Sequence, residues 1–227
     1  MEKMKIAIDG PAASGKTTAG LLLARRLGFI FFDTGIMYRV ITWAALEKGI
    51  DVMNEKEMNK LARDLKIEIK PPSKKDGRVN DVIVDGIDVT LELRNSLVNQ
   101  NVSQVSTYFG VRESLTRKQR SIADAGSIVM AGRDIGTVVL PDADYKFYLD
   151  ASLEVRAERR KREINEDISK DEIIKSLLRR DKIDSNREIA PLKPAEDAII
   201  INTDNKTLDE VVEKMLAIVL SEKTERN

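Results

Sequence analysis

The chain has 227 residues, enough for one sizeable domain with an insert, and its 38 basic and 38 acidic side chains give a formal net charge of zero. It contains no cysteine and no histidine, which excludes disulfides, thiolate metal sites, and nucleophiles, bases or metal ligands of either type. Proton transfer is left to carboxylates and any metal site to a hard, oxygen-ligated ion such as Mg²⁺, and phosphoryl transfer is compatible with both restrictions.

Short apolar runs alternate along the chain with segments of helical periodicity, which favours an α/β fold with a parallel sheet. The runs are continuously apolar, as is typical of strands buried on both faces. Strands are predicted over residues 5–8, 29–32, 127–130, 146–149 and 198–201. Helices are predicted over residues 17–27, 37–48, 112–123, 153–163, 171–184 and 208–220. Ser169 with Glu172, and Thr207 with Glu210, have the spacing of capping boxes.

Between the first predicted strand and the first predicted helix lies the segment GPAASGKT, residues 10–17, which matches the phosphate-binding pattern G-x-x-x-x-G-K-[ST] at every position. Glycines allow backbone N–H groups to close around phosphate oxygens, and the helix N-terminus adds the positive end of its dipole. Lys16 is expected to reach the outer phosphates and the Thr17 hydroxyl to ligate Mg²⁺. The alternative, a glycine turn with a chance lysine, is disfavoured by the flanking strand and helix. The segment therefore predicts binding of a nucleoside triphosphate.

Residues 54–100 differ in pattern from the rest of the chain. A predicted helix over 55–65 leads into an alternating stretch and a polar loop. Two apolar runs then flank Asp85-Gly86, which is a strong hairpin signal. The pattern predicts a small β-containing insert in an α/β host. Two interpretations stay open: decoration of the fold, or a movable module that closes over a substrate.

Basic side chains are concentrated between residues 156 and 187, on two predicted helices joined by a polar turn over 165–167. They are Arg156, Arg159, Arg160, Lys161, Arg162, Arg179, Arg180, Lys182 and Arg187. A charge run of this kind is commonly the solvated face of a helix. It is equally the composition expected of a lid over a polyphosphate, because the planar guanidinium presents a fork of donors.

Four further segments, residues 33–39, 103–112, 132–137 and 180–187, carry conspicuous polar and charged residues. Three of them lie at or just after predicted strand ends or at entries into helices, where open α/β sheets bind ligands. Simpler roles are open for several of these residues: Asp33 as a helix cap, Tyr38 in packing, and Asp134 in a pair with a neighbouring arginine. Asp150, at the end of an apolar run, has the position of a metal-shell carboxylate, but it is expected to cap a helix.

Taken together, these motifs resemble the bacterial cytidylate kinases, members of the nucleoside monophosphate kinase group. The resemblance covers nearly the whole chain and rests on IDGP at 8–11, DTG at 33–35 followed by Tyr38-Arg39, GRDIGTVV at 132–139, and Asn186-Arg187 followed by APL at 190–192. It implies an α/β P-loop nucleoside monophosphate kinase fold: a central five-stranded parallel sheet flanked by helices, a small β-containing insert and a helical lid. The implied domains are a P-loop core over 1–53, 101–155 and 188–227, a monophosphate-binding insert over 54–100, and an arginine-rich lid over 156–187.

By this resemblance, the protein transfers the γ-phosphoryl group of ATP, with Mg²⁺, to CMP or dCMP. The resemblance implies that the ATP phosphates are cradled by Gly10, Pro11, Ala12, Ala13, Ser14, Gly15, Lys16, Thr17 and Thr18. It implies that the acceptor nucleotide is bound by Thr34, Tyr38, Arg39, Ser103, Arg112, Asp134, Arg180, Asp184 and Arg187. It further implies catalytic roles for Lys16, Arg133, Arg156 and Arg160, with Thr17 on the metal.

Within the implied acceptor site, the candidates for cytosine recognition are Thr34, Ser103, Arg112 and Asp134. Asp184 is the candidate for binding the sugar hydroxyls. The candidates for neutralising the acceptor phosphate are Arg39, Arg180 and Arg187. Arg133, Arg156 and Arg160 are expected to face the transferring phosphoryl group. The chemistry agrees, because Asp134 can accept from the exocyclic amino group of cytosine and Arg112 can donate to the ring acceptors.

One position departs from the family pattern. The residue before Gly132-Arg133-Asp134 is commonly acidic in the family, whereas here it is Ala131. A carboxylate at that position would help to hold Mg²⁺ or to orient the acceptor. We therefore assign no carboxylate to the metal, and Thr17 is its one expected protein ligand.

Three other functions fit parts of the sequence. A kinase of the same fold acting on UMP, AMP, dTMP or a non-nucleotide alcohol is disfavoured by the insert and by the Gly-Arg-Asp segment. A GTP-binding switch is disfavoured because Asp209 in the stretch NKTLD, residues 205–209, comes one position too late for the guanine-reading motif N-K-x-D. A nucleic-acid-dependent ATPase is disfavoured by the zero net charge and by the lack of a strand-end Asp-Glu pair.

The expected partners are small nucleotides, namely ATP, CMP and dCMP, with no nucleic acid and no membrane. The sequence shows no signal-peptide pattern and no apolar run near the ~20 residues of a membrane span. We therefore expect a cytoplasmic protein, and a monomer is the simplest expectation for a kinase that closes a lid.

Overall fold

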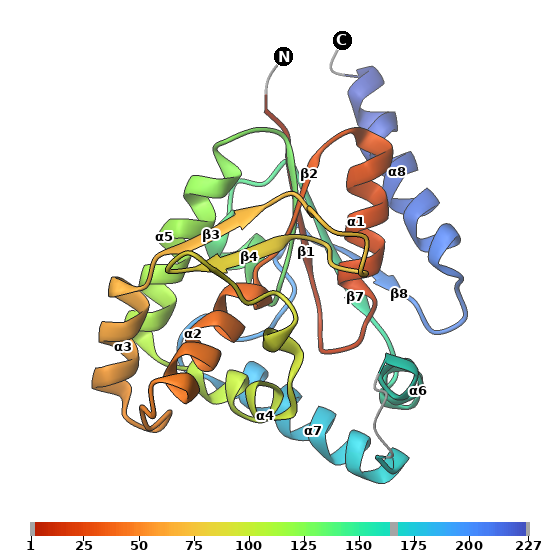
Figure 1. The fold of residues 1–227 in the computed structure, drawn as a ribbon. Helices are drawn as coiled ribbons and strands as arrows, with labels where there is room; N and C mark the ends of the chain where they lie inside the picture. The colour runs from red at the N-terminus through yellow and green to blue at the C-terminus, as the bar shows by residue number, and fades with distance from the viewer. Residues whose placement is uncertain (1–2, 164–167, 226–227) are drawn as a thin grey trace. The chain divides into compact units, whose positions relative to one another are not determined.

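The computed structural model describes residues 3–163 and 168–225, and the chain divides into two compact units (Figure 1). The first unit comprises Met1–Asp33 and Gln119–Asn227, and the second comprises Thr34–Lys118. The second unit contains the whole insert expected over 54–100. The polar turn expected over 165–167 lies outside the described residues.

A five-stranded parallel sheet forms the centre of the first unit, as the sequence predicts, in the order β2-β6-β1-β7-β8. Its strands are β1 (Lys5–Asp9), β2 (Ile30–Asp33), β6 (Ile128–Ala131), β7 (Tyr145–Asp150) and β8 (Ile199–Asn202). Ile6 and Ile8 of β1 and Phe147 of β7 are fully buried. Burial on both faces explains why these central strands read as apolar runs without polar alternation.

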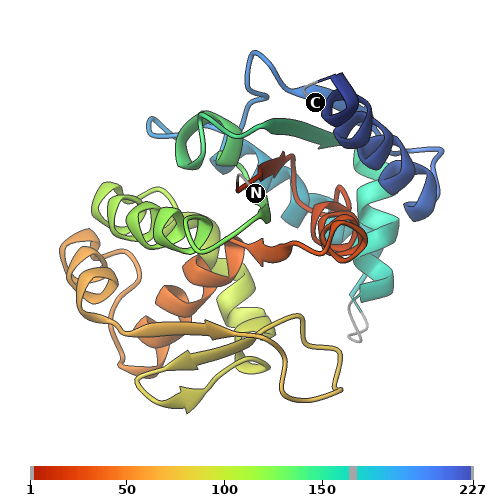
Figure 2. The same cartoon turned by 90° about the horizontal axis from the view of Figure 1, so that it is seen from above.

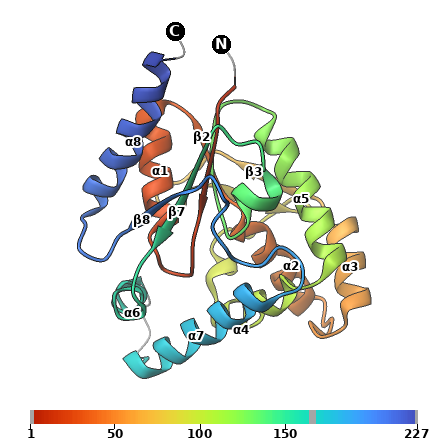
Figure 3. The same cartoon turned by 180° about the vertical axis from the view of Figure 1, so that it is seen from behind.

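Two pairs of helices accompany this sheet. Helices α1 (Lys16–Leu27) and α8 (Leu208–Glu225) lie side by side against one of its faces (Figures 2 and 3). The basic helices α6 (Leu153–Glu163) and α7 (Lys170–Asn186) pack on each other near the carboxyl ends of the strands (Figure 3). The capping boxes predicted at the starts of α7 and α8 are both present. None of the helices in the described part of the chain has the length and apolar character needed to cross a bilayer.

The second unit is built from helices and a small antiparallel sheet of order β3-β4-β5. Its elements are α2 (Gly35–Glu47), α3 (Glu55–Asp64), β3 (Ile67–Lys70), β4 (Asp81–Val84), β5 (Ile87–Asp88), the 3₁₀ turn η1 (Glu92–Arg94), α4 (Ser96–Val105) and most of α5 (Phe109–Ala123). The hairpin predicted at Asp85-Gly86 joins β4 to β5. Both turn residues have positive φ angles, 47° and 87°, as a type I′ turn requires, which explains the Asp-Gly pair.

Besides the short turn η1, two elements were not predicted from the sequence. Helix α4 has the sequence SLVNQNVSQV, rich in weak helix formers, and its first turn is stabilised by Asn95, which accepts from the Val98 amide at 2.8 Å. The other is a π-type turn, η2 (Ile135–Val139), inside the GRDIGTVV motif. Turns this wide and short have no apolar periodicity that would reveal them in a sequence.

Candidate active site

The phosphate loop follows β1 and ends where α1 begins, at Lys16. Gly10 has a φ of 147°, and a Cβ there would lie 2.1 Å from the Leu149 carbonyl oxygen of β7. Gly15, the N-cap of α1, has a φ of 93°. Close backbone approach therefore excludes a side chain at Gly10, and a left-handed backbone disfavours one at Gly15. The result is a backbone loop that ends against the positive end of the α1 dipole.

Lys16 folds back over this loop. Its ammonium group donates to the Pro11 carbonyl oxygen and, at 3.2 Å, to the Ser14 hydroxyl. The residue is buried, and burial, followed by the neighbouring Arg133 charge, lowers its pKa well below the usual value. Phosphate oxygens that enter the loop would favour the charged ammonium form of Lys16.

Thr17, the expected metal ligand, donates its hydroxyl hydrogen bond to Oδ2 of Asp33 at 2.6 Å. Asp33 is the last residue of β2 and pairs in register with Ala131 of β6. A hydroxyl and a carboxylate this close are the hard oxygen donors that Mg²⁺ prefers, so the residues present fit that ion. Asp33 stands one residue before Thr34, the N-cap of α2, whose own side chain makes no cap hydrogen bond.

Asp150, at the end of β7, does not cap α6. Its carboxylate accepts from the adjacent Ala151 amide at 2.9 Å. The Ser152 hydroxyl instead accepts from the Val155 amide, in the first turn of α6, at 3.4 Å. The capping role expected of Asp150 therefore belongs to Ser152.

The Gly-Arg-Asp segment follows β6 and meets the end of α7 through charged side chains. Arg133 donates from Nε to Oδ2 of Asp184 at 2.9 Å. The Asp134 carboxylate accepts from Arg187 at 3.5 Å, and Arg187 also lies 3.8 Å from Asp184. The side chains of Asp134, Asp184 and Arg187 are all nearly inaccessible to solvent. Four charges of alternating sign thus form one buried network, and the pairing of Asp134 with an arginine is confirmed.

Two other features complete the surroundings of this network. Arg187 donates from Nε to the Ala190 carbonyl oxygen at 2.6 Å, and Ala190 has a φ of 52°. Arg180 lies on α7, about one turn before Asp184. The acceptor residues expected in the first unit therefore gather on the Gly-Arg-Asp segment and the C-terminal half of α7.

The arginines of α6 differ in their surroundings. Arg156 is buried, pairs with Asp181 of α7 at 2.7 Å, and donates to the Ala12 carbonyl oxygen of the phosphate loop at 3.3 Å. Arg160 is more exposed and pairs with Glu163 at 3.1 Å. The interpretation of the segment as a solvated helix face is therefore wrong for Arg156.

Arg159 was not assigned a role from the sequence. Its guanidinium donates to the hydroxyl and carbonyl oxygens of Thr203 at 2.9 and 2.7 Å. It also lies 3.8 Å from the position that a Cβ of Gly15 would take. Residues 159 and 160 follow Arg156 by three and four positions, so both lie on the same helix face as Arg156. Spacing alone therefore could not show which of the two arginines lies near the phosphate loop.

The remaining expected acceptor residues lie in the second unit. They are Thr34, Tyr38, Arg39, Ser103 and Arg112. The Arg112 guanidinium stands over the Tyr38 ring, 5.5 Å from its centroid, and donates to the Ser106 carbonyl oxygen at 3.0 Å. Arg39 donates to the Leu93 carbonyl oxygen and to Oδ1 of Asn99 at 3.1 and 2.8 Å. Thr34 is the N-cap of α2, and Ser103 is buried on α4.

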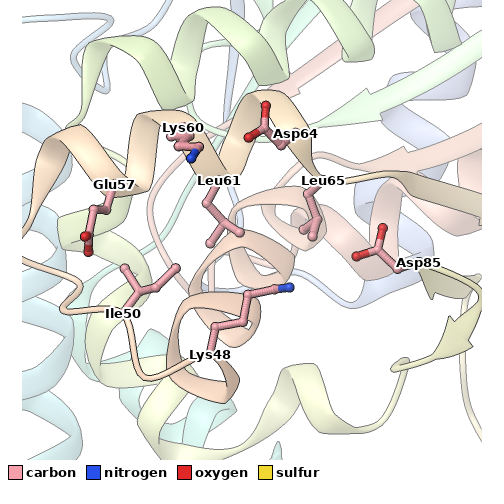
Figure 4. A pocket seen from close by; sticks show the side chains of 8 residues that line it. All are labelled: Lys48, Ile50, Glu57, Lys60, Leu61, Asp64, Leu65 and Asp85. Atoms are coloured by element: carbon pink, nitrogen blue, oxygen red, sulfur yellow. The ribbon is translucent and has the colours of Figure 1, made fainter.

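A pocket of about 410 Å³ also lies in the second unit (Figure 4). The side chains of Leu61 and Leu65 line it, together with charged groups such as Lys48, Lys60 and Asp64. Its lining residues include none of those expected to contact a nucleotide. This pocket is therefore separate from the candidate site.

The matching family model and two related sequences carry the same description. A family model described as cytidylate kinase matches residues 6–221. A cytidylate kinase of Herpetosiphon aurantiacus is 48% identical over 217 residues, which cover 94% of this chain and 93% of that protein. A cytidylate kinase of Bacillus licheniformis is 44% identical over 224 residues, 96% of each chain. Among solved structures, a gluconokinase from Sinorhizobium meliloti aligns with a TM-score of 0.51 and 13% identity over 98% of this chain and 96% of its own, a likeness of fold alone.

Proposed function

The chain belongs to the cytidylate kinase family, and on that premise we propose that it transfers the γ-phosphoryl group of ATP to CMP or dCMP, giving ADP and CDP or dCDP. The observation that carries this function is the family match over residues 6–221, which includes the phosphate loop, the Gly-Arg-Asp segment and both basic helices. The buried charged network at the end of α7 supports it, because it places a carboxylate and arginines beside the segment that follows β6.

We infer that the phosphate loop holds the donor. Its backbone amides and the α1 N-terminus bind phosphate oxygens, and Lys16 contributes a cation at the same place. The Thr17 hydroxyl, with Asp33 beside it at 2.6 Å, would hold Mg²⁺. The ion would supply neutralisation of phosphate charge.

In the first unit, Asp134 is the proposed reader of the acceptor base. Its carboxylate can accept from the exocyclic amino group of cytosine, whereas the carbonyl oxygen that uracil carries at that position would face it as a second acceptor. Buried polar groups left without a partner make such discrimination strong. Asp184 is proposed for the sugar hydroxyls and Arg180 and Arg187 for the acceptor phosphate. In the second unit, Thr34, Tyr38, Arg39, Ser103 and Arg112 keep the acceptor contacts that the family resemblance implies.

The transfer step asks little acid–base chemistry of the protein. The attacking oxygen belongs to a phosphate monoester, whose second pKa is about 6, so it is largely ionised at neutral pH without a base. This suits a chain that has no histidine. Lys16 and Arg133 are neighbouring cations, and they are proposed to stabilise charge on the transferring group, with Arg160 joining them from α6. Arginines in this role contribute roughly 10³–10⁵ to the rate of the best-studied phosphoryl-transfer enzymes.

The function is tested by measuring ADP formation from ATP and Mg²⁺ with CMP, dCMP, UMP, AMP and dTMP as separate acceptors. Fast turnover with CMP and dCMP, and slow turnover with the others, is the expected result. Asp134→Ala is expected to lower kcat/KM for CMP by at least about 100-fold, because a buried base contact is lost. Comparable turnover with every acceptor, or none above ATP hydrolysis, would refute the acceptor assignment and leave only the nucleotide-binding loop.

A further inference from the structure

Asp9 is the last residue of β1 and stands directly before the first glycine of the phosphate loop. It is almost completely buried, with 3% of the residue exposed. Oδ1 accepts a hydrogen bond from the Ile135 amide at 2.8 Å, and Oδ2 accepts one from the Gly136 amide at 2.7 Å. The carboxylate at the end of one strand therefore holds two consecutive amides of the segment that follows β6.

These two amides come directly after Asp134 in the chain. They open the wide turn η2, in which the amides of Val138 and Val139 both donate to the Asp134 carbonyl oxygen. The first amides of a helical turn have no partner inside the turn, and here Asp9 accepts from two of them. The backbone of Asp134 is thus fixed by its own carbonyl on one side and by Asp9 on the other.

The approach of Asp9 to this turn is close. A Cβ on Gly136 would lie 3.4 Å from Oδ2 of Asp9 and 3.1 Å from the Lys146 side chain, so a larger residue there would require the Lys146 side chain to shift. A serine or asparagine can also accept from amides at the start of a turn, without burying a charge. Turn capping alone therefore does not explain a buried carboxylate whose two oxygens both accept from amides of the turn after β6.

We propose that Asp9 is a positioning residue for the acceptor nucleotide: by holding the Ile135 and Gly136 amides, it fixes Asp134 at a set place relative to the phosphate loop. The proposal rests on the proposed function, in which Asp134 contacts cytosine. Asp9 touches no substrate itself. Because Gly10 is its neighbour in the chain, the donor loop and the acceptor-reading segment take their positions from one residue.

Asp9→Asn tests this proposal, because asparagine presents one acceptor and one donor to two amide donors. We expect KM for CMP to rise roughly tenfold and kcat to fall by a similar factor, while KM for ATP changes by less than about threefold. The matched control is Asp144→Asn. Asp144 accepts from the Lys5 amide at the other end of β1 at 2.7 Å, and its replacement is expected to leave both KM values unchanged.

Thermal unfolding separates positioning from support of the fold. At pH 8 the midpoint of Asp9→Asn is expected to equal or exceed that of the wild type, because the variant buries no charge. A parallel rise in both KM values together with a lower midpoint would overturn the proposal, as would kinetics that match Asp144→Asn. Wild-type protein that fails to phosphorylate CMP would refute the proposed function instead, so the two failures are distinct.

A second measurement needs no variant and decides the question if Asp9→Asn does not fold. Burial, with a smaller contribution from Asp134, raises the pKa of Asp9 to about 6, while the two amides and Lys16 oppose that rise. The amide resonances of Ile135 and Gly136 are therefore expected to titrate together in ¹H–¹⁵N spectra. Affinity for cytidine, which has no phosphate to titrate in this range, is expected to fall with the same midpoint as Asp9 gains its proton. Cytidine affinity that stays constant through that titration would overturn the proposal.

Discussion

Thr17 and Asp33 come from a helix start and a strand end, and one hydrogen bond of 2.6 Å joins them. In the neighbouring strand, the position paired with Asp33 is Ala131, where the family pattern commonly has an acidic residue. Asp33 is therefore a carboxylate placed directly beside the expected metal ligand. A hydrogen-bonded outer partner orients a ligand and tunes its affinity for the metal.

Asp33→Asn is expected to raise the Mg²⁺ concentration for half-maximal activity roughly tenfold, because an amide is a weaker acceptor for the Thr17 hydroxyl and carries no charge. Rates across a Mg²⁺ titration at saturating nucleotides measure the effect, and calorimetry of Mg²⁺ binding to the ADP complex checks it without turnover. Asp150→Asn is the control, since Asp150 ends β7 of the same sheet and its carboxylate accepts from the adjacent Ala151 amide. Equal Mg²⁺ requirements for both variants would contradict the role of Asp33.

The raised pKa of Asp9 also predicts how stability depends on pH. Burial lifts this pKa from 3.8 to about 6, so between those values the folded chain retains a proton that the unfolded chain has lost. The contribution of Asp9 to the free energy of unfolding therefore falls as pH rises through this window, and is most favourable below about pH 4. As pH rises from 4 to 7, the free energy of unfolding of Asp9→Asn should increase by roughly 1–3 kcal/mol relative to that of the wild type. Denaturant unfolding at several pH values measures this gain, and a difference that does not vary with pH would contradict it.

Among the structural elements, the small antiparallel sheet is organised around one buried arginine. The Arg78 side chain is 2% exposed and bonds to Asp81, Asp88 and Asp76, each at 2.8 Å. These three carboxylates come from the loop before β4, from β4 itself and from β5. The hydrogen bonds of Arg78 hold the pKa of Asp76 at about 2 and lower that of Asp88, and Ser73 followed by Arg78 lowers the pKa of Asp81. The polar loop of the insert is thus held by charge as well as by the hairpin.

Arg78→Met is expected to lower the thermal unfolding midpoint at pH 7, because three carboxylates lose their common partner. Depressed pKa values stabilise the fold above the unfolded pKa of about 4, and that contribution is lost as pH falls toward 2. The difference in thermal unfolding midpoint between variant and wild type should therefore become smaller as pH falls, and scanning calorimetry at several pH values measures it. Lys74→Met provides the control, since Lys74 is exposed and pairs with Asp88 at 3.4 Å. A gap that stays constant with pH would argue against the charged network.

At the scale of the whole molecule, local patterns predicted the elements well. The five strands of the parallel sheet, the hairpin at Asp85-Gly86 and both capping boxes depend on neighbouring residues, and the structure confirms them. Helix α4 was missed because its stability comes from tertiary packing and an asparagine cap rather than from helix propensity.

The candidate site divides in the same way. The phosphate loop is a contiguous motif and was readable in full. The hydrogen bonds from Thr17 to Asp33, from Arg159 to Thr203, and from the Ile135 amide to Asp9 join residues 16, 44 and 126 positions apart. Contacts of that kind depend on which strands become neighbours, and one sequence read alone does not give that order.

A nucleotide that binds the folded chain should raise its free energy of unfolding, and a nucleotide that binds more tightly should raise it more. A ligand present at 100 times its dissociation constant adds about 2.7 kcal/mol to the free energy of unfolding. CMP and dCMP are therefore expected to raise the thermal midpoint at millimolar concentration, while dTMP and AMP at the same concentration do not. Thermal shift measurements with a non-hydrolysable ATP analogue present test this, and equal shifts for all four monophosphates would contradict selective binding.

The apolar cluster beneath the basic helices has a consequence for how the molecule tolerates heat. Ala12 of the phosphate loop is packed against Ala157 of α6 and against Ile173 and Leu177 of α7. The loop proposed to bind the donor phosphates is thus supported by α6 and α7, the helices that carry the arginines. If warming loosens α7, the packing of Ile173 and Leu177 against Ala12 is lost while the central sheet is still folded. The affinity for the donor nucleotide should therefore decrease some degrees below the temperature at which the sheet unfolds. The packing between the phosphate loop and these two helices then sets the upper working temperature of the protein.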